Sequence, residues 1–297
     1  MARVVLITTG KMEERALAAS LHRLFPAHEF HSPPRLDGFT SATLPPAHEP
    51  RLRPLTNLNK FANTLIGRVA GGRRDDPPAD FVLGVDDVEL ANARAPERIT
   101  GSLRNALATN LPQWQHTEQL RTDLAARCSF HLMAPMTEAY FFADPQALAR
   151  ATAPSAHHPC CFDPSARDVE EFYIDDPPFL TPANSPQPQR YDWRRANREL
   201  HPKHYLEYLT DETLAGRGRY DEVQHGAPAL AELEWAEVIR HDIARPTPFA
   251  RFARSLLADL ADMLGTAPLG IPLADLDRPR CHAQTWPPPR DKVLRNL

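Results

Sequence analysis

The sequence predicts an α/β protein built around a parallel β-sheet. Residues 4–7 and 81–85 form short apolar runs, which are typical of strands covered by helices on both faces. After a tight turn, the first run is followed by an amphipathic helical pattern with Leu17, Leu21 and Leu24 on one side. A buried strand, a turn and a helix in this order are the usual beginning of an α/β domain.

The remaining elements follow from the same periodicities. Strands are expected at residues 3–8, 81–85 and 128–133, with a short one at 29–31, which makes about four parallel strands. Helices are expected at residues 13–25, 56–69, 96–110, 114–126, 137–149, 201–209, 229–241 and 247–264. Within residues 137–149, the pair Asp144-Pro145 interrupts the pattern, because proline suits the first turn of a new helix.

Composition excludes two classes of protein. The chain has 297 residues, of which 42% are hydrophobic and 24% are charged, so it can bury a core and is not wholly disordered. Its apolar runs are far shorter than the roughly 18 residues that a membrane span needs. The net charge of −4 offers no overall basic surface of the kind that nucleic-acid-binding proteins usually show.

The amino terminus and the cysteines indicate a reducing compartment. The opening residues MARVVLITTG run directly into a charged helical pattern, unlike a signal peptide. The cysteines, Cys128, Cys160, Cys161 and Cys281, are therefore expected to be mostly free thiols. We expect a cytoplasmic protein.

Proline usage suggests three parts of the chain. The sequence contains 31 prolines, roughly twice the average usage of about 5%, and they crowd residues 151–189 and the tail 265–297. We expect an α/β core at 1–150, a proline-rich insertion or connection on the surface at 151–200, and a mostly helical portion with an extended tail at 201–297.

Acidic residues follow three of the predicted strands. Glu13 comes shortly after the first strand, Asp86, Asp87 and Glu89 follow the run 81–85, and Glu138 follows the strand 128–133. Because ligands of open parallel sheets gather at the carboxyl ends of the strands, these side chains are expected to converge. Carboxylates of this kind hold Mg²⁺, which keeps several waters. The alternative is that each one only caps or favours the helix that follows it.

Short segments in a fixed order resemble a known family. The turn TGKME at 9–13 and the strand end VDD at 85–87 resemble the Glu-Gly-x-x-Glu and Asp-x-Asp motifs of the Toprim domain. That domain occurs in topoisomerases, primases and overcoming-lysogenisation-defect nucleases. Three further segments are similar to those of a narrower bacterial Toprim-like family of unknown function, often encoded beside an ATPase in phage-defence loci: MTEAYFFADP at 136–145, HPKHYL at 201–206 and PFARF at 248–252.

The resemblance implies a Toprim-like, Rossmann-type parallel sheet with a mostly helical C-terminal elaboration. It also implies a Mg²⁺- or Mn²⁺-dependent nuclease subunit of an anti-phage defence complex, with an ATPase partner, DNA or RNA as substrate, and no membrane. The catalytic residues would be Glu13, Asp86 and Lys11, with Lys11 facing the phosphate, and the metal ligands would be Glu13, Asp86, Asp87, Glu89 and Glu138. Candidate nucleic-acid contacts are Lys203, Arg194 and Arg195, which are otherwise solvent-exposed charges.

The sequence departs from the Toprim pattern at two positions. Thr9 stands where the pattern has its first glutamate, the proposed general base, and Val88 stands where it has the second aspartate. A threonine hydroxyl cannot accept a proton near neutral pH. The site therefore either uses Asp87 or Glu89 in place of the missing acids, or it has decayed. In the second case the chain is a scaffold or sensor subunit that binds the ATPase.

A zinc site is a weaker hypothesis. His157, His158, Cys160 and Cys161 lie close together in the sequence, and Cys281-His282 could supply distant ligands. Structural zinc sites usually show ligand pairs spaced by two to four residues, and adjacent cysteines do not easily bind one ion. We expect these residues to be loop residues without a metal.

Overall fold

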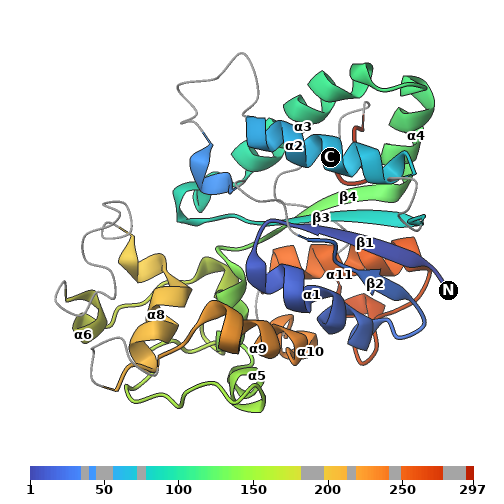
Figure 1. Ribbon diagram of the computed structural model, residues 1–297. Helices are drawn as coiled ribbons and strands as arrows, with labels where there is room; N and C mark the ends of the chain where they lie inside the picture. Colours follow the sequence, from blue (N-terminus) through green and yellow to red (C-terminus); the bar gives the residue numbers. More distant parts are fainter. Residues whose placement is uncertain are drawn as a thin grey trace.

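Four parallel strands form a sheet across the middle of the structure (Figure 1). The computed structural model describes residues 1–34, 40–44, 56–71, 78–181, 197–212, 219–240, 249–276 and 292–297. The strands are β1 (Arg3–Thr8), β2 (Glu29–His31), β3 (Phe81–Asp87) and β4 (Cys128–Met133), in the order β2-β1-β3-β4. The predicted α/β class and parallel sheet are therefore confirmed.

The central strand β3 is longer than its apolar run. It was expected to end at Val85, but it continues through Asp86 and Asp87, which pair with Leu132 and Met133 of β4. Backbone hydrogen bonds to a neighbouring strand do not depend on side-chain polarity, so the ladder carries both aspartates to the carboxyl edge of the sheet.

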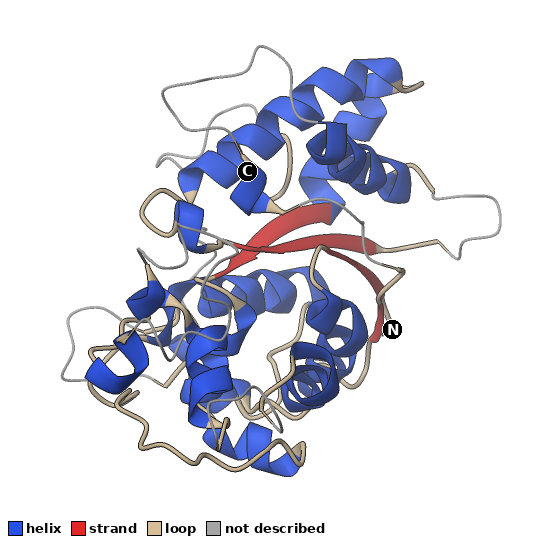
Figure 2. Cartoon of the chain, turned by 60° about the vertical axis from the view of Figure 1, so that its left-hand side comes forward, coloured by secondary structure: helices blue, strands red, loops and turns tan. Residues whose placement is uncertain are grey.

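Helices cover both faces of the sheet, so that the molecule has three layers (Figure 2). One core cluster includes side chains of α1 (Lys11–Leu24) and α11 (Arg251–Leu264), and the other includes side chains of α2 (Thr56–Val69), α3 (Glu97–Asn110) and α4 (Thr117–Arg127). Burial of both faces explains why the strands are apolar without alternation.

The other helices lie on the α1 side of the sheet, most of them near its carboxyl edge (Figure 1). They are α5 (Pro145–Arg150), α6 (Pro177–Leu180), α8 (Pro202–Leu209), α9 (Ala227–Ala231) and α10 (Trp235–Val238). Short 3₁₀ helices occupy Ser41–Thr43, Leu90–Asn92, Leu111–Gln113, Thr137–Phe142, Val169–Glu171, Arg198–Leu200 and Leu273–Asp275, and a π-helix occupies Glu222–Gly226. Among the described helices, none combines the length and the apolar character that crossing a bilayer requires.

Several predicted helices differ from the observed ones. The helix expected at 229–241 is divided into α9 and α10, and that at 137–149 is a 3₁₀ helix followed by α5. The helix expected at 114–126 begins at Thr117, after a left-handed residue at His116. The last helix was expected to begin at residue 247; it begins at Arg251, because Ala250 has a φ of 52° and cannot continue a right-handed helix.

The described part of the proline-rich segment contributes to the core. Phe162, Phe172 and Phe179 are buried. The rings of Phe162 and Phe172 pack against Phe142 with centroids 5.5 and 4.9 Å away, and the ring of Phe179 packs against Tyr205 at 4.9 Å. The expectation that residues 151–200 only lie on the surface is therefore corrected for this part. The aromatic side chains show no helical or strand period because they lie in loops and in helices of a single turn, such as α6 with Phe179.

The segment 292–297 covers the outer edge of β4. The Asn296 side chain accepts a hydrogen bond from the Phe130 N–H (3.0 Å) and donates one to the Phe130 carbonyl (2.6 Å). The Arg295 N–H donates to the carbonyl of Cys128. An amide side chain thus replaces a neighbouring strand at this edge, which would otherwise expose unpaired backbone groups.

Replacing Asn296 by alanine is expected to lower the free energy of unfolding by about 2–4 kcal/mol. Two buried backbone groups lose their partners, and each costs roughly 1–3 kcal/mol. Urea unfolding followed by circular dichroism measures the change, and Lys292→Ala, an exposed position of the same segment, is the matched control. If Asn296→Ala lowers the free energy of unfolding by no more than the control does, this role of Asn296 is contradicted.

Candidate functional site

A small acidic cavity lies at the carboxyl edge of the sheet, on the side of α1. Its volume is about 170 Å³, and five carboxylates and one lysine line it. The complete lining is Gly10, Met12, Glu13, Asp87, Glu89, Met136, Glu138, His201, Lys203 and Glu222. The turn after β1, the ends of β3 and β4, and the C-terminal helical portion therefore all contribute to one cavity.

Glu13 lies in the first turn of α1 and folds back over the preceding turn. A Cβ atom at position 10 would lie 1.8 Å from the Glu13 Oε2 atom, so only glycine leaves room for the carboxylate there. Glu13 is 4% exposed. The glycine of the TGKME turn therefore serves to bring a buried carboxylate to the sheet edge.

Thr137 links Glu13 to Asp87. Its Oγ1 atom lies 2.5 Å from the Glu13 Oε1 atom and 3.3 Å from the Asp87 Oδ1 atom, and its backbone N–H donates to the same Asp87 oxygen at 3.2 Å. A hydroxyl has one hydrogen and can donate to only one of the two carboxylates at a time. Two acidic groups are thus held close together around a single donor.

The two aspartates that end β3 point to opposite faces of the sheet, as consecutive strand residues do. Leu83 and Val85 belong to the core on the α1 side, whereas Val82 and Val88 belong to the core on the α2 side. Asp87 shares the orientation of the first pair and lines the acidic cavity. Asp86 shares the orientation of the second pair and does not line it.

Asp86 is instead bound to Thr9. The Thr9 hydroxyl donates to the Asp86 Oδ1 atom at 2.5 Å, while Asp86 Oδ2, which is buried, has no hydrogen-bond partner within the described residues. Asp86 is 4% exposed. The threonine that replaces the expected glutamate thus contacts the first aspartate on the α2 side of the sheet edge.

Glu89 reaches the cavity through an unusual backbone conformation. Its φ is 60° and its ψ is 151°, a region that non-glycine residues rarely occupy and that costs of order 1–3 kcal/mol. The Glu89 N–H donates to the carbonyl of Pro135, and Glu89 Oε1 accepts a hydrogen bond from Thr40. Strain of this kind is concentrated at functional sites, and here it places a fourth carboxylate at the sheet edge.

Glu138 and Lys203 meet in the same cavity. Glu138 is the second residue of the 3₁₀ helix after β4 and is 3% exposed, and its Oε1 atom has no hydrogen-bond partner within the described part of the chain. Lys203, in the first turn of α8, forms an ion pair with Glu222 (Nζ to Oε2, 2.5 Å). The lysine therefore lies among carboxylates and is not the exposed charge that its sequence position suggested.

Burial raises the pKa of the carboxyl groups at this edge. Loss of solvation raises the pKa of Asp86 to about 8, although the hydrogen bond from Thr9 lowers it. Loss of solvation also raises the pKa of Glu138 to about 8, although the attraction of Lys203 lowers it. The pKa of Asp87 is raised well above its usual range by burial and by the carboxylate of Glu13. Burial also raises the pKa of Glu13. Groups with pKa values near neutrality are a common property of active sites.

The chemistry of the lining fits a hard divalent cation. The acidic groups of the lining all offer oxygen ligands, and the unpartnered Glu138 Oε1 is a buried oxygen that a water bound to such a cation would satisfy. Over the described residues, no three His, Cys, Asp or Glu side chains are placed together as metal ligands. Mg²⁺ is usually bound through one or two carboxylates with waters completing its shell, so three protein ligands are not required.

The other predicted contacts are placed as follows. Lys11 is exposed at the start of α1 and does not line the cavity. Arg194 and Arg195 lie outside the described residues, as do Cys281 and His282. Cys160 and Cys161 are exposed free thiols, and the ring of His158 stacks on Tyr208, so the described zinc candidates form no ligand group.

Several cavity residues were not predicted as site residues. Glu222 lies in the π-helix, and its side chain lines the cavity only because this helix returns to the sheet edge. His201 begins the segment HPKHYL, and its Nδ1 atom accepts a hydrogen bond from the His204 N–H at the start of α8. The HPK sequence was therefore a usable signal for His201, whereas nothing in the sequence around Glu222 indicates its role.

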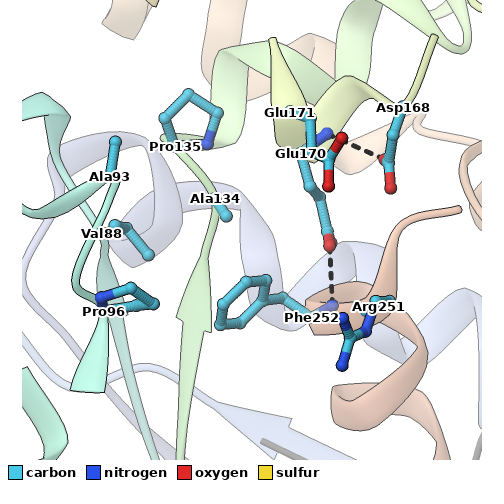
Figure 3. A pocket seen from close by; sticks show the side chains of 10 residues that line it. All are labelled: Val88, Ala93, Pro96, Ala134, Pro135, Asp168, Glu170, Glu171, Arg251 and Phe252. Carbon is cyan, nitrogen blue, oxygen red and sulfur yellow. Dashed lines mark hydrogen bonds between the residues drawn. The ribbon is translucent and has the colours of Figure 1, made fainter. Parts of the chain in front are cut away.

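A second pocket of about 210 Å³ lies beside the acidic cavity (Figure 3). Val88 and Pro135 line this pocket, whereas their neighbours in the sequence, Glu89 and Met136, line the acidic cavity. One wall is largely apolar, and the other carries acidic groups that bind the start of α11. Glu170 accepts a hydrogen bond from the Phe252 N–H, and Asp168 accepts one from the Ala250 N–H. The segments that follow β3 and β4 therefore line both pockets.

No protein family model, curated protein or solved structure matches the chain. Membership of the Toprim-like family stays a prediction, and the function has to be inferred from the cavity.

Proposed function

We propose that the chain is a divalent-metal-dependent phosphodiesterase that acts on DNA or RNA, as the nuclease subunit of an anti-phage defence complex with an ATPase. The observation that carries the proposal is the acidic cavity, in which five carboxylates from separate parts of the chain meet at the carboxyl edge of a parallel sheet. Open α/β sheets bind their ligands at this edge. The defence complex and the ATPase come from the family resemblance alone.

Glu13, Asp87 and Glu89 would hold the metal ion, with waters completing its shell. Mg²⁺ or Mn²⁺ supplies a Lewis acid that polarises a phosphoryl oxygen and makes a bound water more acidic. Asp86 supports this arrangement from the α2 side of the sheet edge through its hydrogen bond with Thr9, and does not itself line the cavity.

Glu138 takes the role of general base that Thr9 cannot perform. Its pKa of about 8 lets it accept a proton from an attacking water and return it near neutral pH, as efficient acid–base catalysis requires. Lys203, which is close enough to Glu138 to affect its pKa, helps to neutralise charge on the phosphate. Arg251 lines the neighbouring pocket, where it has no ion-pair partner among the described residues, and would contact the nucleic acid.

A second candidate function is a scaffold or sensor subunit whose catalytic site has decayed. Two observations favour it: Thr9 stands where the Toprim pattern has its first glutamate, and no three ligands are placed together over the described residues. In this case the acidic cavity would bind a cation or a basic segment of a partner without catalysing a reaction.

Cleavage assays distinguish the two functions. The purified full chain is incubated with plasmid, single-stranded DNA and tRNA in Mg²⁺ or Mn²⁺, alone and with the product of an adjacent ATPase gene. We expect metal-dependent cleavage that falls at least about 100-fold in Glu138→Gln, because a general base contributes 10²–10⁴-fold. Glu171→Gln, an exposed acid of the neighbouring pocket, is the control. Formation of a complex with the ATPase without cleavage in any condition would favour the scaffold.

A further inference from the structure

The second pocket is the immediate neighbour of the acidic cavity along two segments of the chain. Val88 and Pro135 line the pocket, and the residues that follow them, Glu89 and Met136, line the cavity. Consecutive Cα atoms across a trans peptide bond are about 3.8 Å apart. A ligand that has one group in the acidic cavity can therefore place an adjoining group in the second pocket.

The second pocket has the size of a small ligand group with an apolar face. Its volume is about 210 Å³, below the roughly 300–1,000 Å³ of sites that hold drug-sized ligands. Val88, Pro96 and Pro135 lie on one side of it, opposite the acidic wall (Figure 3), and Phe252 lines it as well. Apolar side chains of this kind contact the flat face of a nucleobase that has left its stack.

The acidic wall offers hydrogen-bonding groups in fixed positions. Glu170 accepts hydrogen bonds from the Tyr140 hydroxyl (2.9 Å) and from two N–H groups at the start of α11 (2.8 and 2.9 Å). Asp168 accepts one from the Ala250 N–H at 3.0 Å. Because a carboxylate can accept about four hydrogen bonds, Glu170 keeps the capacity for a further one from a ligand.

This wall suits the edge of a nucleobase and does not suit a phosphate. Base edges carry both donors and acceptors, and burial raises the pKa of Glu170 to about 8, so near neutral pH its carboxyl group either accepts or donates a hydrogen bond. A phosphate is negatively charged, and acidic side chains repel it. Glu171 is exposed, and none of the described residues hydrogen-bonds to its carboxylate, so we assign it no contact.

Arg251 provides a place for the phosphate outside the pocket. It is the first residue of α11, lines the pocket, and has no ion-pair partner among the described residues. A guanidinium group binds phosphate oxygens through two parallel hydrogen bonds. A nucleotide can therefore place its base between the two walls and its phosphate at Arg251.

We propose that the second pocket binds one unstacked nucleobase of the strand whose scissile phosphate lies in the acidic cavity, so that the substrate is single-stranded DNA or RNA. A base inside a duplex is stacked and paired, and it enters such a pocket only after it has been flipped out at a cost in free energy. This inference deepens the proposed function and rests on it.

The test measures binding in the absence of cleavage. The full chain carrying Glu138→Gln, which we expect to cleave at least about 100-fold more slowly, is titrated with fluorescein-labelled oligonucleotides in Mn²⁺, and binding is followed by fluorescence anisotropy. The probes are a single strand, its duplex, and an abasic strand of equal length with the same phosphates. We expect the single strand to bind about 5- to 150-fold more tightly than the abasic strand, the range that stacking of one base contributes, and more tightly than the duplex.

A substitution that fills the pocket isolates its contribution. Ala93 is an exposed residue of the lining, and we expect Ala93→Trp to lower the affinity for the single strand to that for the abasic strand, which stays unchanged. Ala91→Trp is the matched control, because Ala91 is exposed two positions away and lines neither the second pocket nor the acidic cavity. Arg251→Met should weaken the binding of both strands, since phosphate contacts do not depend on the base.

Thermal melts of each variant establish that it is folded, and Ala93→Leu, with a smaller effect in the same direction, replaces Ala93→Trp if the latter is not. The base pocket is refuted if the abasic strand or the duplex binds as tightly as the single strand, or if Ala93→Trp binds the single strand like its parent. A complex with the ATPase that Ala93→Trp disrupts, with unchanged strand binding, would assign the pocket to a partner protein instead. If no variant binds any of the strands, the proposed nuclease function fails, and the inference fails with it.

Discussion

Asp87→Asn is expected to abolish metal binding, whereas Asp86→Asn is expected to retain it. The two residues are adjacent, and both are carboxylates with raised pKa values, but only Asp87 lines the acidic cavity and contacts Thr137. Mn²⁺ at 100 times its dissociation constant should stabilise the native chain by about 2.7 kcal/mol. For a chain of this size, that corresponds to a rise in melting temperature of several degrees.

Both substitutions should also raise the melting temperature of the metal-free protein near pH 8. Each one removes a negative charge from a buried group of carboxylates, and repulsion within that group falls. The distinguishing result is therefore the response to Mn²⁺: absent in Asp87→Asn and preserved, with an affinity reduced only a few-fold, in Asp86→Asn. The reverse pattern, with Asp86→Asn losing the response, would show that the wrong face of the strand has been assigned to the metal.

The stability of the metal-free protein is expected to fall steadily as the pH rises from about 5 to 8. Asp86 and Glu138 titrate near pH 4 when unfolded and at about pH 8 when folded. Between these values the folded state binds more protons than the unfolded state, so the free energy of unfolding decreases with pH. Each group contributes up to about 1.4 kcal/mol per pH unit.

Thermal melts between pH 5 and 8, with and without Mn²⁺, measure this effect. Mn²⁺ should restore more stability at pH 8 than at pH 5, because ionised carboxylates bind it and protonated ones do not. Glu170, whose pKa burial also raises to about 8, lies in the neighbouring pocket and should leave a residual slope that Mn²⁺ does not remove. In Glu138→Gln the slope should decrease. A melting temperature that rises with pH over this range would contradict the assigned protonation states.

The acidic strand ends could be predicted from the sequence because the order of strands and turns is a local property. Glu13 follows a strand and a glycine turn, and Glu138 follows the strand β4, so their arrival at one edge required only a parallel sheet. Which of Asp86 and Asp87 enters the cavity was not predictable. The answer depends on where β3 ends and on the alternation of its side chains, and the apolar run 81–85 suggested a strand that ends too early.

The role of Lys203 could not be predicted from the sequence either. Near a helix start it has the pattern of an exposed phosphate contact, but the fold brings it beside Glu138, 65 positions away, and beside Glu222 in a π-helix. Neither relation leaves a periodic signal. The burial of the aromatic side chains in the proline-rich segment was missed for the same reason, since loops and one-turn helices are too short to show an amphipathic pattern.

By itself, the sequence determined that this is an α/β protein with a parallel sheet, and that carboxylates follow its strands. Apolar runs and helical periods specify these features through local burial, which each segment carries in its own residues. The tertiary structure decided which carboxylates share a cavity, which one faces away, and which cation accompanies them. Those relations depend on side-chain direction at the strand ends and on contacts between segments far apart in the chain. Coulomb energy and desolvation shift the pKa values of these carboxyl groups only once the segments have met.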